Sequence, residues 1–158
     1  MEQREYTTHD RSGWDSGPWD GEPDKVQFVD EATKLPCLAV RNHSGAWCGY
    51  VGVPPGHKDF GKGYSDVDYN VHGGLTFADK CQPSSDESHG ICHVPAPGEP
   101  DHVWWFGFDC NHCDDFAPGM HFRMKSLGHD FRIPGEKYRT LDYVKAQCAK
   151  LAAQLVTE

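Results

Sequence analysis

Residues able to do chemistry are concentrated in one short stretch, Asp109-Cys110-Asn111-His112-Cys113-Asp114-Asp115. Six of these seven side chains can carry charge, exchange protons or ligate a metal. Histidine and carboxylate ligands that leave one coordination position open suit water activation by a bound metal. The stretch therefore predicts, as one candidate, a metal-dependent hydrolase that uses zinc or another divalent cation, with the ligands His72, Asp109, His112 and Asp115. The chain lacks the H-E-x-x-H signature that would make this candidate specific.

The cysteines offer a different metal site. Cys110 and Cys113 have the C-x-x-C spacing of zinc ligands, and Cys81, Cys92 or His93 would have to complete the set. Structural zinc sites use four nitrogen or sulfur ligands in two closely spaced pairs, and this chain has a single such pair. The seven cysteines are an odd number, and the opening segment is polar and has no apolar signal core. We therefore expect a cytoplasmic protein whose thiols are reduced.

A third candidate is a pocket that binds a ligand without converting it. Aromatic rings can stack on a planar group, and paired glycines can bring backbone N–H groups close to an anion. The expected ligand is a small anionic molecule, nucleotide-derived, held by Trp47, Tyr50, Lys58, Lys62, His72, Gly73, Gly74, Trp105, Asp109 and His112. Simpler interpretations remain open for these residues: tryptophans in the core, solvated lysines and a tight bend at the glycines. For either site we expect His72, Asp109 and His112 to converge in one polar pocket.

Residues 103–109 give the strongest strand pattern and would deliver Asp109 to the site. In extended geometry Trp105 and Asp109 share one face, whereas Phe106 and Phe108 share the other. Asp109 is then the last residue of a buried strand, at a rim where polar groups can form a site. The alternative is that Asp109 only caps the turn that follows.

Three other segments show clear patterns. Residues 37–53 predict an antiparallel hairpin. Residues 66–72 alternate strictly in period two, which predicts a half-buried strand ending at His72. Residues 140–156 predict a helix capped by Thr140, with an apolar stripe that should pack on the sheet.

Together these elements predict an α+β fold, with a mostly antiparallel sheet of about five strands and the C-terminal helix packed on one face. The length of 158 residues suits one domain, and 17 glycines and 11 prolines predict many loops. Residues 1–24 are polar, with Trp14 and Trp19 as large anchors, and are expected to form a flexible N-terminal arm. Residues 25–158 then form the single α+β domain.

The formal net charge of −9 argues against a nucleic-acid backbone as a partner. No apolar run reaches the ~18 residues of a membrane span, so a membrane partner is not expected either. A protein partner is compatible with this composition.

Four motifs together carry a family resemblance, those at residues 47–53, 71–76, 91–95 and 104–110. They read Trp-Cys-Gly-Tyr-Val-Gly-Val, Val-His-Gly-Gly-Leu-Thr, Ile-Cys-His-Val-Pro and Trp-Trp-Phe-Gly-Phe-Asp-Cys. The chain resembles, over residues 36–156, a family of small uncharacterised proteins found in bacteriophage and prophage genomes. The resemblance implies a phage protein in the host cytoplasm but no activity. In that setting, a protein that binds a small nucleotide-derived molecule would sequester a host defence signal, and the alternative is an inhibitor of a host protein. The family has a small residue at the position of Cys113, which speaks against zinc on the Cys110/Cys113 pair.

Overall fold

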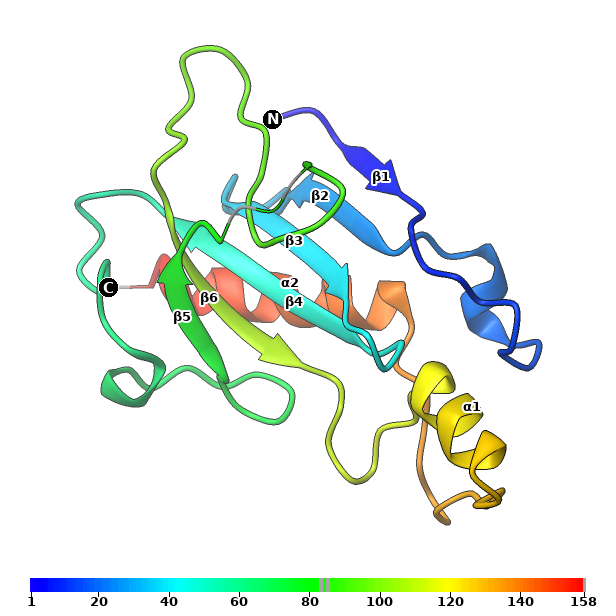
Figure 1. The fold of residues 1–158 in the computed structure, drawn as a ribbon. Helices are drawn as coiled ribbons and strands as arrows, with labels where there is room; N and C mark the ends of the chain where they lie inside the picture. Colours follow the sequence, from blue (N-terminus) through cyan, green and yellow to red (C-terminus); the bar gives the residue numbers. More distant parts are fainter. Residues whose placement is uncertain (83, 85, 158) are drawn as a thin grey trace.

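The protein is built on one antiparallel sheet (Figure 1). The structure is a computed structural model that describes residues 1–82, 84 and 86–157. The sheet has six strands in the order β1-β2-β3-β4-β6-β5, with the bounds β1 Arg4–Tyr6, β2 Lys25–Val29, β3 Pro36–Arg41, β4 Trp47–Val53, β5 Phe77–Lys80 and β6 Trp104–Asp109. The predicted α+β fold is confirmed, with six strands rather than about five. The predicted hairpin is the β3–β4 pair, and β6 lies inside the sheet between β4 and the edge strand β5.

One face of the sheet packs against helix α2, Leu141–Leu155. The helix begins where the sequence predicted, because the Thr140 side chain accepts a hydrogen bond from the Tyr143 N–H and so caps the first turn. Its apolar stripe is buried against the strands, where Phe106 and Phe108 point toward it. Figure 1 shows α2 running behind the sheet, where it contacts β4 and β3.

The other face of the sheet carries a second apolar cluster, made of Leu38, Tyr50, Val103 and Trp105. Trp105 and Phe106 therefore lie on opposite faces, as the period-two pattern predicted. This second face is covered by irregular chain between β5 and β6, since Ile91 packs on the cluster and the His93 ring stands 5.3 Å from the Trp105 ring, centroid to centroid.

The strand predicted at 66–72 is wrong. Val67, Tyr69 and Val71 do face the core, but the segment lies outside the sheet. Three of its backbone groups are bonded by side chains of α2 in place of a partner strand: Gln154 bonds both the N–H and the C=O of Asn70, and Gln147 accepts from the His72 N–H.

Helix α1, Pro118–Ser126, was not predicted, because its apolar residues do not fall on one face. The one sequence feature that indicates this helix is Pro118. Proline is favoured at the first helical position, because the N–H that it lacks would have no partner within the helix there. Figure 1 shows α1 beyond the end of the sheet. Within the part of the chain that the structure describes, neither helix is long and apolar enough to cross a membrane.

Residues 1–24, expected as a flexible arm, lie against the domain in this structure. Strand β1 pairs with β2, and Trp19 is 6% exposed between the rings of Phe116 and Tyr138. Asp24, at the end of this segment, pairs with Arg41 at 2.9 Å, and both side chains are fully buried. The backbone N–H groups of Thr8 and His9 donate to the same carboxylate. A buried ion pair therefore joins the segment to the sheet.

Two cysteines expected to be reduced form a disulfide, Cys81–Cys92. Gln82 and Ile91 exchange both backbone hydrogen bonds, and the next pair outward in such a ladder has closely approaching Cα atoms. The Cα atoms of Cys81 and Cys92 are accordingly 4.8 Å apart. This bond removes both sulfurs from the zinc ligand set considered above.

Replacing Asp24 tests the buried ion pair. Asp24→Ala should lower the free energy of unfolding by about 3–5 kcal/mol, because the buried Arg41 loses its nearest carboxylate and keeps only Glu22, 3.5 Å away. Urea unfolding followed by tryptophan fluorescence measures the change. Asp68→Ala, at an exposed carboxylate, is the matched control and should change stability by less than about 0.5 kcal/mol. Equal effects of the two substitutions would contradict the role given to Asp24.

Candidate functional site

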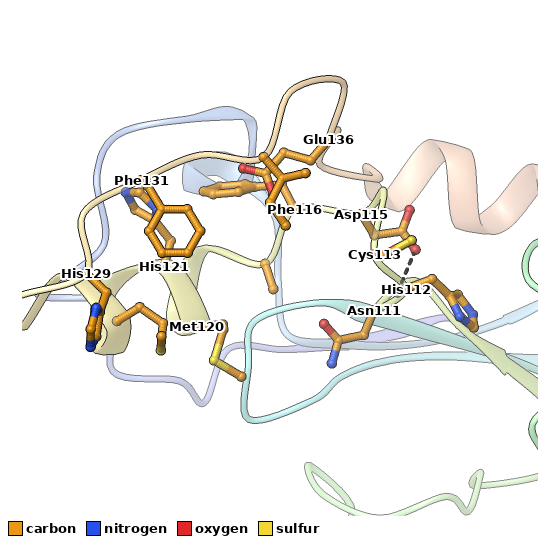
Figure 2. A pocket seen from close by; sticks show the side chains of 13 residues that line it. Asn111, His112, Cys113, Asp115, Phe116, Met120, His121, His129, Phe131 and Glu136 are labelled. Atoms are coloured by element: carbon orange, nitrogen blue, oxygen red, sulfur yellow. Dashed lines mark hydrogen bonds between the residues drawn. The ribbon is translucent and has the colours of Figure 1, made fainter. Parts of the chain in front are cut away.

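The chemistry-rich stretch after β6 is organised by the carboxylate of Asp115. The side chain is fully buried, and both of its oxygens are used. Oδ1 accepts from Arg139 Nε at 2.8 Å. Oδ2 accepts from His72 Nε2 at 2.9 Å and from the backbone N–H of His112 at 3.1 Å, the bond drawn in Figure 2. We call Asp115, His72, Arg139 and Tyr143 the Asp115 junction.

His72 uses both ring nitrogens within this junction. A carboxylate only accepts hydrogen bonds, so Nε2 carries a proton. In the neutral ring Nδ1 then accepts from the hydroxyl of Tyr143, 2.7 Å away. The junction thus ties together three segments that are distant in sequence: the turn at 71–74, the stretch after β6 and the start of α2.

Burial by itself raises the pKa of Asp115, but the hydrogen bonds from His72, Arg139 and the His112 N–H outweigh burial, so the pKa lies below its usual value. Burial also raises the pKa of Tyr143, partly opposed by the Arg139 guanidinium, 5.1 Å above its ring. The junction is therefore an ionised carboxylate beside a protonated phenol near neutral pH. It is suited to fixing loops in place, because both oxygens of Asp115 and both ring nitrogens of His72 are held in hydrogen bonds.

His112 lies between His72 and Asp109. Its Nε2 is 3.3 Å from Asp109 Oδ1, and its ring centroid is 5.9 Å from that of His72. Asp109 belongs to the face of the sheet that carries Trp105, whereas His72 contacts α2 on the opposite face. Asp109 also caps the turn after β6, since its Oδ1 accepts from the Asn111 N–H at 3.1 Å. The structure brings the three side chains near one another through His112, but not into one common pocket.

The residues present do not fit a metal centre. Among residues 1–82, 84 and 86–157 no three His, Cys, Asp or Glu side chains are grouped closely enough to hold a metal ion. Both nitrogens of His72 and both oxygens of Asp115 already have hydrogen-bond partners. Within the predicted set, His72 and the His112 backbone are hydrogen-bonded to Asp115, whereas Asp109 lies 3.3 Å from His112 Nε2 without a hydrogen bond to it.

The predicted pocket of rings, lysines and glycines is not assembled. Trp47 and Trp105 are fully buried and Tyr50 is 8% exposed, so these rings form core. Gly73 and Gly74 have the expected positive φ angles, 68° and 80°. The N–H of Gly74, however, donates to Val71 O and so closes a turn.

The two predicted lysines lie at the far end of α2 from His72. Lys62 pairs with Asp59 at 2.9 Å, and His57, beside Lys58, hydrogen-bonds the Leu155 carbonyl. His72 contacts Tyr143 in the first turn of α2, about 18 Å from Leu155 along the helix axis. A single small ligand does not reach both ends.

A groove does open on the other side of the Asp115 junction (Figure 2). Its volume is about 190 Å³. Figure 2 shows Asn111, His112 and Cys113 on one side, and Met120, His121, His129 and Phe131 on the other. The remaining lining residues are Asp115, Phe116, Ala117, Met124, Ile133 and Glu136. Of the predicted ligand-binding residues, His112 alone lines this groove in the part of the chain that the structure describes.

The sequence therefore missed most of the groove and two members of the junction. Arg139 and Tyr143 are more than twenty residues from Asp115 along the chain, and no local spacing connects them. The signal for the groove was the clustering of histidines with exposed aromatic residues between 112 and 131, in a region without a regular period.

Comparisons with known proteins find no relative. No protein-family model matches the chain, and no curated protein or solved structure matches it either. The geometry described above is therefore the basis for the function proposed below.

Replacing Asp115 tests the junction. Asp115→Asn should lower the free energy of unfolding near pH 7 by about 2 kcal/mol, because charge-assisted hydrogen bonds to His72 and Arg139 are lost. Asp114→Asn is the matched control: Asp114 is 63% exposed and lies 3.6 Å from the same arginine. It should cost less than about 1 kcal/mol.

The difference between wild type and Asp115→Asn should also depend on pH. The folded pKa of Asp115 is lowered, so its stabilisation is fully present above the unfolded pKa of about 3.9 and is lost as pH falls below that value. Urea unfolding at several pH values measures the difference, which should narrow below about pH 4. A constant difference from pH 7 to pH 3 would refute the assigned charge state.

Proposed function

We propose that this protein binds a small anionic molecule with a planar ring, a nucleotide-derived ligand, in the groove of Figure 2 and does not convert it. The observation that carries the proposal is the composition of the groove: exposed apolar walls beside three imidazoles. Ligand sites combine apolar walls with a few convergent polar groups in this way.

The apolar walls supply a surface for a ring. Phe131 is 61% exposed, Ile133 is 48% exposed and Met120 is 39% exposed. Stacking of a base on an aromatic side chain contributes about 1–3 kcal/mol. The groove is smaller than the ~300–1,000 Å³ of typical small-molecule pockets, so the ring enters it and the rest of the ligand extends over the surface.

The groove itself is lined by Asp115 and Glu136 and, among the described residues, by no Lys or Arg, but the segment around it is more basic than the chain as a whole. Residues 118–139 contain five Lys or Arg and two Asp or Glu, in a chain with net charge −9. Carboxylates farther away than ~8–10 Å are largely screened at physiological salt, so the net charge of −9 does not by itself exclude an anionic ligand. The imidazoles of His121 and His129 add hydrogen-bond donors at the groove itself.

Binding without turnover agrees with the state of the neighbouring groups. The carboxylate of Asp115 and the ring of His72 have all of their hydrogen-bonding positions occupied, and neither is available as a general base. In a phage protein, as the motif resemblance implies, such binding would take place in the host cytoplasm and would sequester a nucleotide-derived defence signal.

A second candidate function, inhibition of a host protein by direct contact, is favoured by one observation. Five of the seven exposed large apolar side chains among the described residues lie on α1 and the loop after it: Met120, Phe122, Leu127, Phe131 and Ile133. Exposed apolar surface often marks a protein interface.

Two substitutions separate the two functions. Phe131 lines the groove, whereas Leu127, 72% exposed, belongs to the same apolar surface but not to the groove. Purified protein is incubated with nucleotides, cyclic dinucleotides and host extract and then denatured, and the released molecules are identified by mass spectrometry. Calorimetry then gives the affinity for the recovered molecule. Phe131→Ala should weaken its binding by about tenfold or more, and Leu127→Ala should leave it unchanged.

The other outcomes are equally definite. Recovery of a cleaved nucleotide would show an enzyme and overturn the binding proposal. A host protein that co-purifies with wild type, and is lost with both variants, would establish the protein-interaction function instead.

A further inference from the structure

Residues 86–94, which we call the strap, are held against β2 by a buried lysine. Lys25 is 1% exposed, and its ammonium group contacts backbone carbonyl oxygens of the strap. The four contacts are with Glu87 at 2.7 Å, His89 at 3.3 Å, Gly90 at 3.0 Å and Cys92 at 3.1 Å. The ammonium group of Lys25 thus hydrogen-bonds the main chain of the strap and none of its side chains.

Gln27, two residues further along the same face of β2, binds main chain as well. Its side-chain amide donates to Val94 O at 3.2 Å and accepts from Val94 N–H at 2.8 Å. Gln27 is also 1% exposed. Lys25 and Gln27 therefore recognise an extended backbone at two points, independently of the sequence it carries.

One strap side chain is also recognised, and it is acidic. The Glu87 carboxylate accepts from Arg4 at 2.9 Å and from the Tyr6 hydroxyl, both on β1. The surface formed by Arg4, Tyr6, Lys25 and Gln27 thus suits an extended peptide with a carboxylate near its N-terminal end.

A buried donor elsewhere on the same face of the sheet, on β6, is left without a partner. The Trp105 side chain is fully buried, and its indole N–H has no hydrogen-bond acceptor among the described residues. Buried polar groups normally have a partner, and leaving one unpaired costs about 1–3 kcal/mol. The His93 ring of the strap, 5.3 Å from the Trp105 ring, does not satisfy this donor.

The Cys81–Cys92 disulfide closes the chain that carries the strap. Both cysteines are partly exposed, so a reductant can reach them. An intact bond keeps the strap at high local concentration beside Lys25, because it shortens the connection between strap and sheet.

We propose that the Arg4, Tyr6, Lys25 and Gln27 surface is a peptide-binding site that the strap occupies, and that reduction of Cys81–Cys92 lets an extended acidic peptide of a partner protein take its place. The reductant is a protein dithiol. One of its thiolates attacks a disulfide sulfur and forms a mixed disulfide, and its second thiolate then releases the protein. Cys81 and Cys92 end as two thiols, and the dithiol ends as a disulfide, so two electrons and two protons are transferred.

The first test is hydrogen exchange of the full-length protein, oxidised and reduced. Amides of residues 86–94 should exchange at least about tenfold faster after reduction, while amides of α2 change little. The variant Cys81→Ser/Cys92→Ser should match the reduced protein and should no longer respond to reductant. Unchanged strap exchange, or an equal rise in α2 that indicates global unfolding, would overturn the proposal.

The second test is binding of a labelled synthetic peptide of residues 86–94 that carries Cys92→Ser, followed by fluorescence anisotropy. It should bind the double-serine variant at least about tenfold more tightly than the oxidised wild type, because the strap competes for the site in the latter. Adding Lys25→Met to the double-serine variant should weaken binding of the peptide by about tenfold. The control Lys150→Met, at an exposed lysine of α2, should leave the affinity unchanged.

A peptide with Glu87→Gln should also bind the double-serine variant more weakly. Equal affinity for the oxidised and double-serine proteins, or no effect of Lys25→Met, would refute the site.

Discussion

The structure is governed by one constraint: its sheet has two apolar faces, and helix α2 covers only one of them. The second face buries Leu38, Tyr50 and Trp105 and must be closed by irregular chain. Such chain has backbone carbonyls without partners in a ladder, and buried carbonyls need donors. Lys25, on strand β2, supplies such a donor: its one ammonium group lies among four backbone carbonyl oxygens of the strap.

This solution places charge inside the protein and requires compensation. Burial lowers the pKa of Lys25, and the nearby carboxylates Glu87 and Asp86 oppose the shift. The same pattern recurs at Asp24 and at Asp115, where a buried carboxylate receives a guanidinium and backbone N–H groups. In each case a charged side chain joins segments that are far apart in sequence. Polar contacts of this kind hold irregular segments against the sheet, as helix packing does in proteins with more regular structure.

The parts of the fold that could be predicted are those set by local patterns. The alternation in β6 and the stripe of α2 depend on neighbouring residues, so both were correct. The segment at 66–72 has an equally clear alternation, yet its backbone is satisfied by Gln147 and Gln154 of α2, and no local signal reveals those partners. Strand β1 was missed for a related reason, since it has only three residues and no apolar alternation, and its partner β2 lies far along the chain.

The candidate site shows the same limit. The density of acids, histidines and thiols at 109–115 correctly marked a region of polar contacts. Residues distant in sequence, chiefly Tyr143 and Arg139, determine which of these side chains remain free to bind. They hydrogen-bond His72 and Asp115 at the atoms that a metal or substrate would need. The rings expected to bind a ligand were used for the core, because a sheet with two apolar faces requires many large side chains.

The contact between Gly73 and His112 has a consequence for how sequences with this fold can diverge. A Cβ atom at position 73 would lie 2.1 Å from His112 Nε2, and the backbone φ of Gly73 is +68°. The glycine is therefore needed for the close approach of the imidazole as well as for its turn. Positions 73 and 112 form one steric unit, so we expect them to vary together among homologous chains. A side chain at 73 would be accompanied by a smaller residue at 112, and the groove beside His112 would then be wider.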